Sequence, residues 1–213
     1  LKTKDVNFTY GQMSILTDIN IQFERGKVHA IIGSSGSGKT TLLSILSGIT
    51  SYQEGSILYN GEDLSKLSLD KYRKETSIIF QNYNLISYLS AIQNIVIALD
   101  ISKTKEDKKE KAKQLLEQVG IPEKDWNRSC VKLSGGQQQR VAIARALAID
   151  STIIFADEPT GNLDSKTGND ITNLLCKMAT NYNKCVICVT HDIKFRKKAD
   201  IVYSLQDGTI ITD

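Results

Sequence analysis

The chain predicts an α/β fold built on a parallel sheet of the doubly wound type, and three observations lead to this prediction. Short apolar runs recur as in strands buried on both faces, and they lie at residues 28–32, 78–80, 153–156 and 185–189. Stretches with helical spacing of apolar residues alternate with these runs. Glycine-rich turns stand directly before two of the expected helices, at residues 40–46 and 137–149.

Further β-structure is predicted near the N-terminus. Residues 1–21 have the pattern of strands, and Asn60 with Gly61 forms a dipeptide that is typical of hairpin turns. We therefore expect an antiparallel β-subdomain beside the parallel sheet.

The middle of the chain predicts helices. Residues 86–134 contain no strong strand pattern, whereas residues 91–99 and 105–119 have helical spacing, and a glycine and a proline follow the second helix. We expect the chain to form a single domain. Its core would comprise residues 1–85 and 135–213, with a helical subdomain inserted at about 86–134.

The motif GSSGSGKT follows a predicted strand and opens a predicted helix, which is the context of a phosphate-binding loop. Glycines there allow successive N–H groups to turn toward an anion at a helix N-terminus. Lys39 can reach β- and γ-phosphates, and the Thr40 hydroxyl is placed to ligate Mg²⁺. A flexible Gly/Ser linker would lack the flanking strand and helix. The candidate phosphate-binding residues are Gly33, Ser34, Ser35, Gly36, Ser37, Gly38, Lys39, Thr40 and Thr41.

A second glycine-rich helix start lies in LSGGQ at residues 133–137. Ser134, Gly135, Gly136 and Gln137 form an exposed helix N-terminus that suits a phosphate. One nucleotide does not need two such cradles on the same side. We therefore expect the second to close on a triphosphate from the opposite face, supplied by another copy of the chain.

Two adjacent carboxylates, Asp157 and Glu158, end the apolar run at residues 153–156. Acidic pairs at strand ends are often solvated turn residues. Downstream of a phosphate loop, however, the two carboxylates suit different roles, with Asp157 facing Mg²⁺ and Glu158 facing an attacking water.

With these motifs, the chain resembles the nucleotide-binding ATPase domain of ABC transporters over essentially its whole length. In that family's terms, residues 33–40 match the Walker A motif, residues 133–137 the signature, and residues 153–157 Walker B. The resemblance implies a P-loop NTPase core that binds ATP and Mg²⁺, with Glu158 as the catalytic carboxylate.

Four more residues match the family's patterns. Gln81 in SIIFQ matches the Q-loop residue that senses Mg²⁺ and water, and His191 in VTHD matches the switch histidine at the γ-phosphate. Asp164 matches the D-loop aspartate, and Tyr10 stands where the family stacks an aromatic ring on adenine. The resemblance thus implies Glu158, His191, Gln81 and Lys39 as catalytic residues and Thr40, Gln81 and Asp157 as ligands of Mg²⁺.

Within the family, GNLD at residues 161–164 and the segment after Gln81 are similar to the lipoprotein-release, macrolide-export and cell-division branch. Ser87 stands where that branch usually has proline, and Gln93 where it usually has glutamate. This likeness implies an ATP-dependent head-to-tail homodimer that drives an integral membrane permease with few spans and a large extracytoplasmic region. Transport and ATP-driven mechanical signalling to an extracytoplasmic effector both remain open.

Composition and charge exclude other classes. The 213 residues contain 40% hydrophobic residues but no apolar run long enough to span a membrane, so we expect the chain to depend on a membrane partner. The first residues predict an edge strand rather than a signal peptide, which suggests a cytoplasmic chain with reduced cysteines, peripheral on the inner membrane face. A net charge of +3 is too small and too dispersed to indicate nucleic acid. A chromosome-associated ATPase would insert a long coiled coil before LSGGQ, and this chain has no heptad run there.

Overall fold

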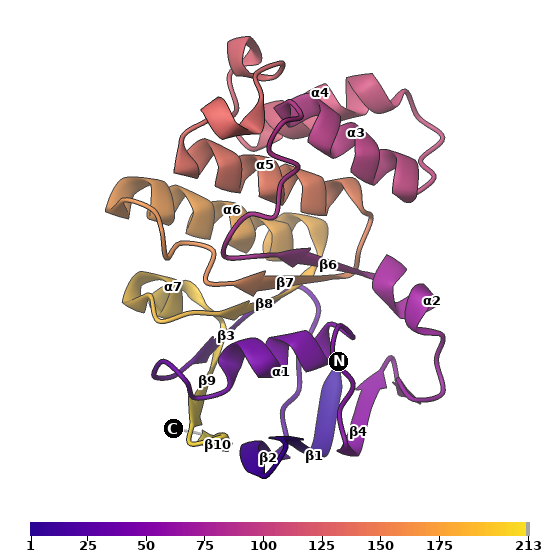
Figure 1. Ribbon diagram of the computed structural model, residues 1–213, viewed down its shortest axis with the longest axis vertical. Coiled ribbons are helices and arrows are strands. Elements are labelled where there is room, and N and C mark those ends of the chain that lie inside the picture. Colours follow the sequence, from indigo (N-terminus) through magenta and orange to yellow (C-terminus); the bar gives the residue numbers. More distant parts are fainter. Residues whose placement is uncertain (212–213) are drawn as a thin grey trace.

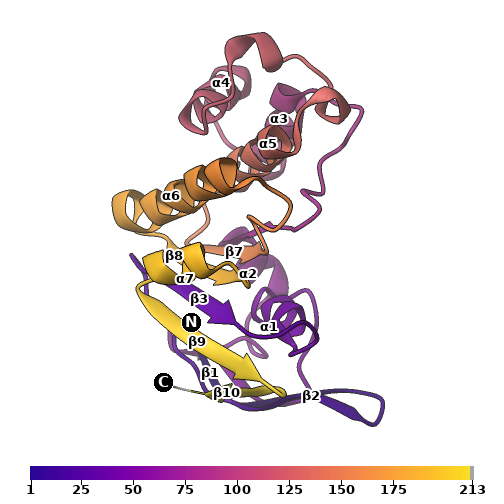
Figure 2. The same ribbon diagram turned by 90° about the vertical axis from the view of Figure 1, so that its left-hand side faces the viewer.

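The computed structural model describes residues 1–211. Its elements form stacked layers, with helices above and below a parallel sheet and an antiparallel sheet at the lower end (Figure 1). Rotated by 90°, the molecule shows the same layers, and β10 packs against β2 of the antiparallel sheet (Figure 2). The helices on both faces of the parallel sheet confirm the predicted doubly wound α/β class.

The larger sheet has the strand order β10-β9-β3-β8-β7-β6 in the described chain. Its strands are β3 (Val28–Ile32), β6 (Thr76–Ile79), β7 (Ile153–Asp157), β8 (Cys185–Val189), β9 (Ile201–Gln206) and β10 (Thr209–Ile211). Neighbouring strands from β9 to β6 run parallel, and β10 is antiparallel to β9. The carboxyl ends of β3 and β7 therefore meet at one edge of the sheet, which is where ligands bind in open α/β sheets.

The second sheet is antiparallel, as expected, with the order β2-β1-β4-β5. Its strands are β1 (Lys2–Tyr10), β2 (Met13–Ile19), β4 (Glu54–Tyr59) and β5 (Glu62–Asp63). Asn60 and Gly61 join β4 to β5 with φ values of 51° and 86°, the left-handed geometry of a tight hairpin turn. The turn predicted at this dipeptide is confirmed.

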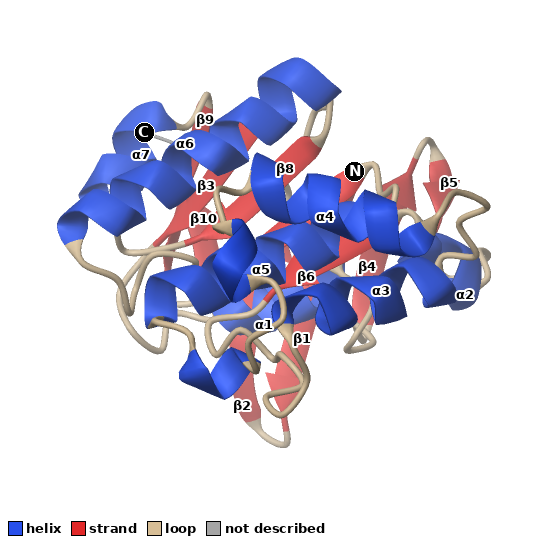
Figure 3. Cartoon of the chain, turned by 90° about the horizontal axis from the view of Figure 1, so that it is seen from above, coloured by secondary structure: helices blue, strands red, loops and turns tan. Residues whose placement is uncertain are grey.

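Helices cover both faces of the larger sheet. They are α1 (Lys39–Leu46), α2 (Leu69–Lys74), α3 (Ala91–Ile101), α4 (Lys108–Gln118), α5 (Gly135–Ala148), α6 (Ser165–Tyr182) and α7 (Ile193–Lys198), with short 3₁₀ turns at Glu123–Asp125 and Cys130–Lys132. Helix α1 contacts β7 and β8 from below, and α5 and α6 lie above the sheet. Seen from above, α3 and α4 lie beside α5, on the side of α5 away from α6 and α7 (Figure 3).

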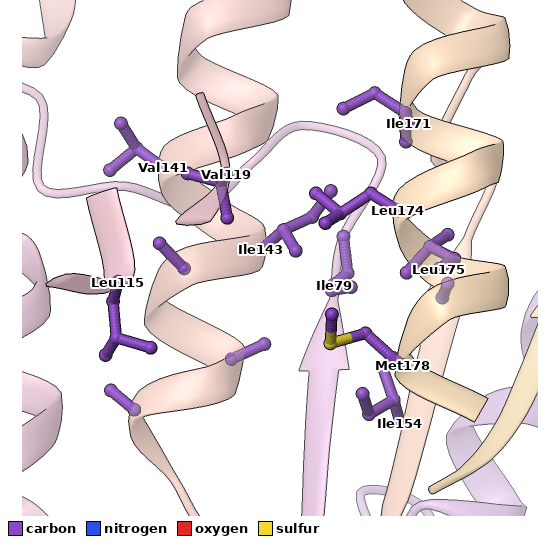
Figure 4. Packing of buried hydrophobic residues seen from close by; sticks show 14 of the residues in the cluster. Ile79, Leu115, Val119, Val141, Ile143, Ile154, Ile171, Leu174, Leu175 and Met178 are labelled. Carbon is purple, nitrogen blue, oxygen red and sulfur yellow. The ribbon is translucent and has the colours of Figure 1, made fainter. Parts of the chain in front are cut away.

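Alternate residues of the parallel strands face two hydrophobic clusters. In the upper cluster, Ile79 and Ile154 of the sheet pack beneath Ile143 of α5 and Met178 of α6 (Figure 4). Cys188 belongs to this cluster, whereas Cys185 belongs to the lower one between the sheet and α1. These two thiols therefore face opposite sides of the sheet.

The predicted starts of one strand and one helix were wrong, and polar residues explain both. The strand expected at residues 78–80 begins at Thr76, because Ser77 is buried and shares a 2.9 Å hydrogen bond with Ser151 instead of facing water. The helix expected from residue 105 begins at Lys108, because the Asp107 carboxylate accepts the N–H groups of Lys109 and Glu110 and caps the helix.

Helix α5 connects the two regions that the sequence separates at residue 134. It packs against α3 and α4 on one side and against β6 and α6 on the other. The domain boundary at 86–134 stays a prediction, and α5 contacts both the helical region and the sheet. Among residues 1–211, no helix combines the length and apolar composition that crossing a membrane requires.

Candidate functional site

The loop between β3 and α1 has a backbone that requires glycine. Gly36 and Gly38 have φ values of +81° and +99°, in the left-handed region. A Cβ on Gly33 would lie 2.2 Å from the carbonyl oxygen of Leu205 on β9, which no side chain can do. The sequence thus folds into a narrow loop whose N–H groups precede the first turn of α1.

Lys39 reaches back across this loop. Its Nζ donates hydrogen bonds to the carbonyl oxygens of Gly33 at 3.0 Å and Ser34 at 2.8 Å. The ammonium group therefore lies at the mouth of the loop, where phosphate oxygens would compete for its protons. The placement agrees with the role expected from the motif.

A cavity of about 580 Å³ lies above the loop. It is lined by Ile15, Gly33, Ser35, Gly36, Gly38, Lys39, Thr40, Thr41, Gln81, Glu158 and His191. All four residues expected to be catalytic thus line one cavity, although they lie far apart in sequence.

Asp157 and Thr40 lie together beside this cavity. The Thr40 hydroxyl donates to Oδ1 of Asp157 at 3.3 Å. Burial raises the pKa of the Asp157 carboxyl, the Thr40 hydrogen bond lowers it, and the neighbouring Glu158 charge raises it again. A buried carboxylate beside a hydroxyl and a second carboxylate is an oxygen donor set that suits a hard divalent cation.

Glu158 and His191 form a pair at the carboxyl ends of β7 and β8. The Glu158 backbone has φ of 44°, and its N–H donates to the carbonyl oxygen of Val189 at 2.9 Å. His191 Nδ1 lies 2.9 Å from Oε2 of Glu158, and the His191 N–H donates to the same oxygen at 3.3 Å. A carboxylate so held at the cavity wall can accept a proton from a bound water.

The cavity fits a nucleoside triphosphate with Mg²⁺. The Ser37 hydroxyl oxygen is buried and has no hydrogen-bond partner within residues 1–211, but Ser37 does not line this cavity. The backbone cradle and Lys39 suit the phosphates, and the oxygens of Thr40 and Asp157 suit the cation.

The second glycine-rich motif lies elsewhere. Ser134 caps α5 in a reciprocal capping box with Gln137. A Cβ on Gly135 would meet the Tyr83 hydroxyl at 3.1 Å, and one on Gly136 would meet the Thr167 methyl at 2.6 Å. Within the described chain, the motif packs against the segment after Gln81 and the start of α6, and it does not line the 580 Å³ cavity.

Ser34, Ser37, Asp157, Tyr10 and Asp164 do not line the cavity in the described structure. Tyr10 is 59% exposed at the end of β1 and packs edge-to-face on Phe8, with 4.8 Å between ring centroids. Asp164 caps α6 by accepting the N–H groups of Lys166 and Thr167. The expected roles of Tyr10 toward adenine and of Asp164 toward the dimer partner stay predictions.

Sequence reasoning missed Ile15 and Arg145. Ile15 lines the cavity because β2 passes over Gly38, and no motif marks it. Arg145 donates hydrogen bonds to the carbonyl oxygens of Tyr83, at 3.0 Å, and Asn84, both with left-handed backbones. No motif marks Arg145, and its partners lie about sixty residues away in the sequence.

Comparisons with known proteins agree with this geometry. The family model described as ABC transporter matches residues 16–161. The chain is 45% identical to the ABC transporter ATP-binding protein YclH of Bacillus subtilis (strain 168), over 98% of this chain and 94% of YclH.

A second relative is the macrolide export ATP-binding/permease protein MacB of Shewanella sp. (strain W3-18-1), with 39% identity over 95% of this chain. The chain spans 32% of the length of that protein. Among solved structures, the dimeric post-hydrolysis state of the ATP-binding cassette MJ0796 bound to ADP and Pi has a TM-score of 0.89 and 35% identity, over 99% of this chain and 96% of that one. The chain belongs to the ABC transporter family as an ATP-binding domain of the ATPase type.

Proposed function

We propose that this chain is the MgATP-hydrolysing subunit of a transporter and energises a MacB-like membrane permease, with export as its role. The observation that supports this proposal best is the convergence of Lys39, Gln81, Glu158 and His191 on one cavity at the carboxyl edge of the parallel sheet. The name of the MacB relative, which joins an ATP-binding part and a permease, supports the choice of partner.

The residues of this chain would divide the chemistry among them. Lys39 and the N–H groups of residues 33–41 bind the phosphates, while Thr40 and Asp157, with Gln81, hold Mg²⁺ directly or through water. When bound, Mg²⁺ neutralises charge on the β- and γ-phosphates. Glu158 accepts a proton from the attacking water, and His191 orients that carboxylate and contacts the γ-phosphate.

The second half of the site would come from another copy of the chain. Ser134, Gly135, Gly136 and Gln137 do not line their own chain's cavity, yet they form a phosphate-suited helix start. In a head-to-tail dimer this start would close over the partner's γ-phosphate, with Asp164 at the interface and Tyr10 on the adenine. The dimeric MJ0796 relative, which is bound to ADP and Pi, supports this arrangement.

Complementation in trans tests the composite site. Ser134→Arg damages the helix start that a chain donates, and Lys39→Ala damages the loop that it keeps. Each variant alone should be inactive, whereas a one-to-one mixture rebuilds one intact site in each mixed dimer. Because half of randomly paired dimers are mixed, ATPase activity should recover to at most about a quarter of wild type if the sites act independently.

Two results would contradict the composite site. One is a Ser134→Arg chain with wild-type turnover. The other is a wild-type rate per chain that stays constant on dilution far below the dimer dissociation constant. Near-normal turnover of Lys39→Ala would contradict the phosphate-loop assignment itself.

A groove between the sheet edge and the helical region would receive the permease. Two adjoining cavities of about 280 and 540 Å³ share Ile101 and Ile149 in their walls. Ile86 and Arg145 also line the first cavity. Ile86 belongs to the segment after Gln81, and Arg145 donates hydrogen bonds to that segment. A permease seated there would sense movement of that segment, and the chain would lie on the cytoplasmic face of the membrane. Loss of co-purification with the permease in an Ile101→Glu variant, with ATPase activity of the isolated chain retained, would support this docking site.

A further inference from the structure

The side-chain amide of Gln137 is bound on both of its sides. Its Oε1 accepts the backbone N–H of Ser134 at 3.0 Å, and its Nε2 donates to Oδ2 of Asp125 at 2.8 Å. The Ser134 hydroxyl in turn accepts the backbone N–H of Gln137 at 3.3 Å. The Ser134 N–H requires the Gln137 amide oxygen on its side. The amide NH2 group of Gln137 therefore points the other way, where it needs an acceptor.

Asp125 supplies that acceptor from a buried position. Its side chain is 4% exposed, and it belongs to the 3₁₀ turn Glu123–Asp125. Its second oxygen, Oδ1, accepts a hydrogen bond from Arg128 at 2.7 Å, and Arg128 also donates to the carbonyl oxygen of Lys132 at 3.1 Å. One carboxylate therefore links this turn, the approach to LSGGQ and the first turn of α5.

The capping box uses the Ser134 hydroxyl as a hydrogen-bond acceptor. Within residues 1–211 this hydroxyl accepts a hydrogen bond and donates none, so its proton is available to a ligand outside the chain. Ser134 keeps this arrangement only while Gln137 caps it. If the Gln137 amide turned over, two N–H donors would face each other at Ser134.

We propose that Asp125 is a positioning residue for the phosphate-binding helix start that one chain presents to another. It acts through Gln137, by fixing the amide so that Ser134 points its hydroxyl outward. The inference rests on the proposed composite site, and it assigns a role to a residue outside the 33–41 and 133–137 motifs.

Substitutions at residues 125 and 128 separate this role from that of an ordinary ion pair. In Asp125→Asn, one oxygen faces two donors, and the charged guanidinium should take it because charge-assisted hydrogen bonds are stronger. Gln137 then loses its acceptor, although shape is kept. Asp125→Leu removes both acceptors and fills the buried space. Arg128→Ala does the reverse, because it removes the ion pair and leaves the bond from Gln137 to Asp125.

The measurement is the dissociation constant of the ATP-bound dimer, by sedimentation, with every variant made in a Glu158→Gln parent that retains ATP. Both substitutions of Asp125 should raise this constant about tenfold or more. Arg128→Ala should raise it less than about threefold, and Asp107→Ala, which removes the side-chain cap on α4 in the same region, should leave it unchanged. Affinity of the monomer for MgATP should stay the same in all of them.

Equal shifts at residues 125 and 128 would overturn the proposal, and so would an unchanged dimer constant in Asp125→Leu. The Glu158→Gln parent variant, without further substitutions, tests the proposed function separately. A Glu158→Gln chain that stays monomeric when saturated with ATP, both alone and with the permease present, would contradict the composite dimer itself and, with it, this inference.

Discussion

The Nδ1 atom of His191 lies 2.9 Å from Oε2 of Glu158, and the backbone N–H of His191 donates to that same oxygen at 3.3 Å. The two residues follow the neighbouring strands β7 and β8, whose parallel pairing brings Asp157 opposite Val189. One carboxylate oxygen of Glu158 is thereby occupied. The other remains the candidate acceptor for a proton from water.

Glu158→Gln should reduce ATP turnover about 100-fold or more while MgATP affinity is retained, because the amide keeps the shape and loses the basicity. Steady-state ATPase assays and nucleotide titration measure the two effects. Glu62→Gln, which changes an exposed acid on β5, serves as the matched control. Turnover within threefold of wild type would show that Glu158 is not the base.

Asp157→Asn should stabilise the nucleotide-free protein at neutral pH. Because burial raises the pKa of this carboxyl, folding opposes its ionisation, and stability falls as pH rises from about 4 through the raised pKa. Removing the charge should raise the melting midpoint by about 2–4 °C, as about 1 kcal/mol does in a chain of this size.

The same substitution should abolish the extra stabilisation that MgATP gives to the wild type, since it removes a proposed ligand of Mg²⁺. Thermal melts with and without MgATP check both effects. The difference between wild type and Asp157→Asn should also disappear near pH 4, and a difference that persists there would assign the effect to packing rather than charge.

His29 should make the protein less stable in mild acid. Its ring is fully buried beside Phe23 and Tyr203, its Nε2 accepts the N–H of Glu24 at 2.9 Å, and burial lowers its pKa despite the nearby Glu24 and Asp200. A lowered histidine pKa contributes stability above the unfolded value of about 6.5, and that stability is lost as pH falls below it.

Urea unfolding at pH 7.5 and 5.5 measures this loss. His29→Gln keeps an acceptor for the Glu24 N–H and cannot become charged, so its stability should change less between the two pH values. An equal loss of unfolding free energy in wild type and His29→Gln would mean that a group other than His29 causes the acid sensitivity.

Gly136→Ala should destabilise the chain through one methyl group. The added Cβ would lie 2.6 Å from Cγ2 of Thr167, a stiff β-branched side chain at the start of α6. Overpacking of this kind costs about 1–3 kcal/mol. Thr167→Ser removes the methyl and keeps the hydroxyl, so the double variant should recover most of the lost stability in urea unfolding. A double variant as unstable as Gly136→Ala would mean that the backbone, rather than Thr167, resists the substitution.

The sequence by itself determined the strands β3, β7 and β8, the turn at Asn60 and the glycine-rich start of α5, but neither β9 and β10 nor the start of α4. Buried parallel strands must be apolar on both faces, so the runs at β3, β7 and β8 are visible without a structure. Caps and left-handed turns depend on neighbours within four residues, which is why Ser134 with Gln137 and the turn at Asn60 could be predicted. The strand start at Thr76 could not, because its polar residues are satisfied by a distant serine.

Tertiary structure decided which of these local features meet. The parallel register of β7 and β8 brings Glu158 to His191, and β2 brings Ile15 over the loop. The link between Asp125 and Gln137 depends on where a 3₁₀ turn packs beside α5. Such contacts join residues through the closure of long loops, and sequence spacing contains no information on their geometry. The same packing turns Ser134 away from its own chain's cavity, which local sequence could not determine because it depends on the placement of an entire helix.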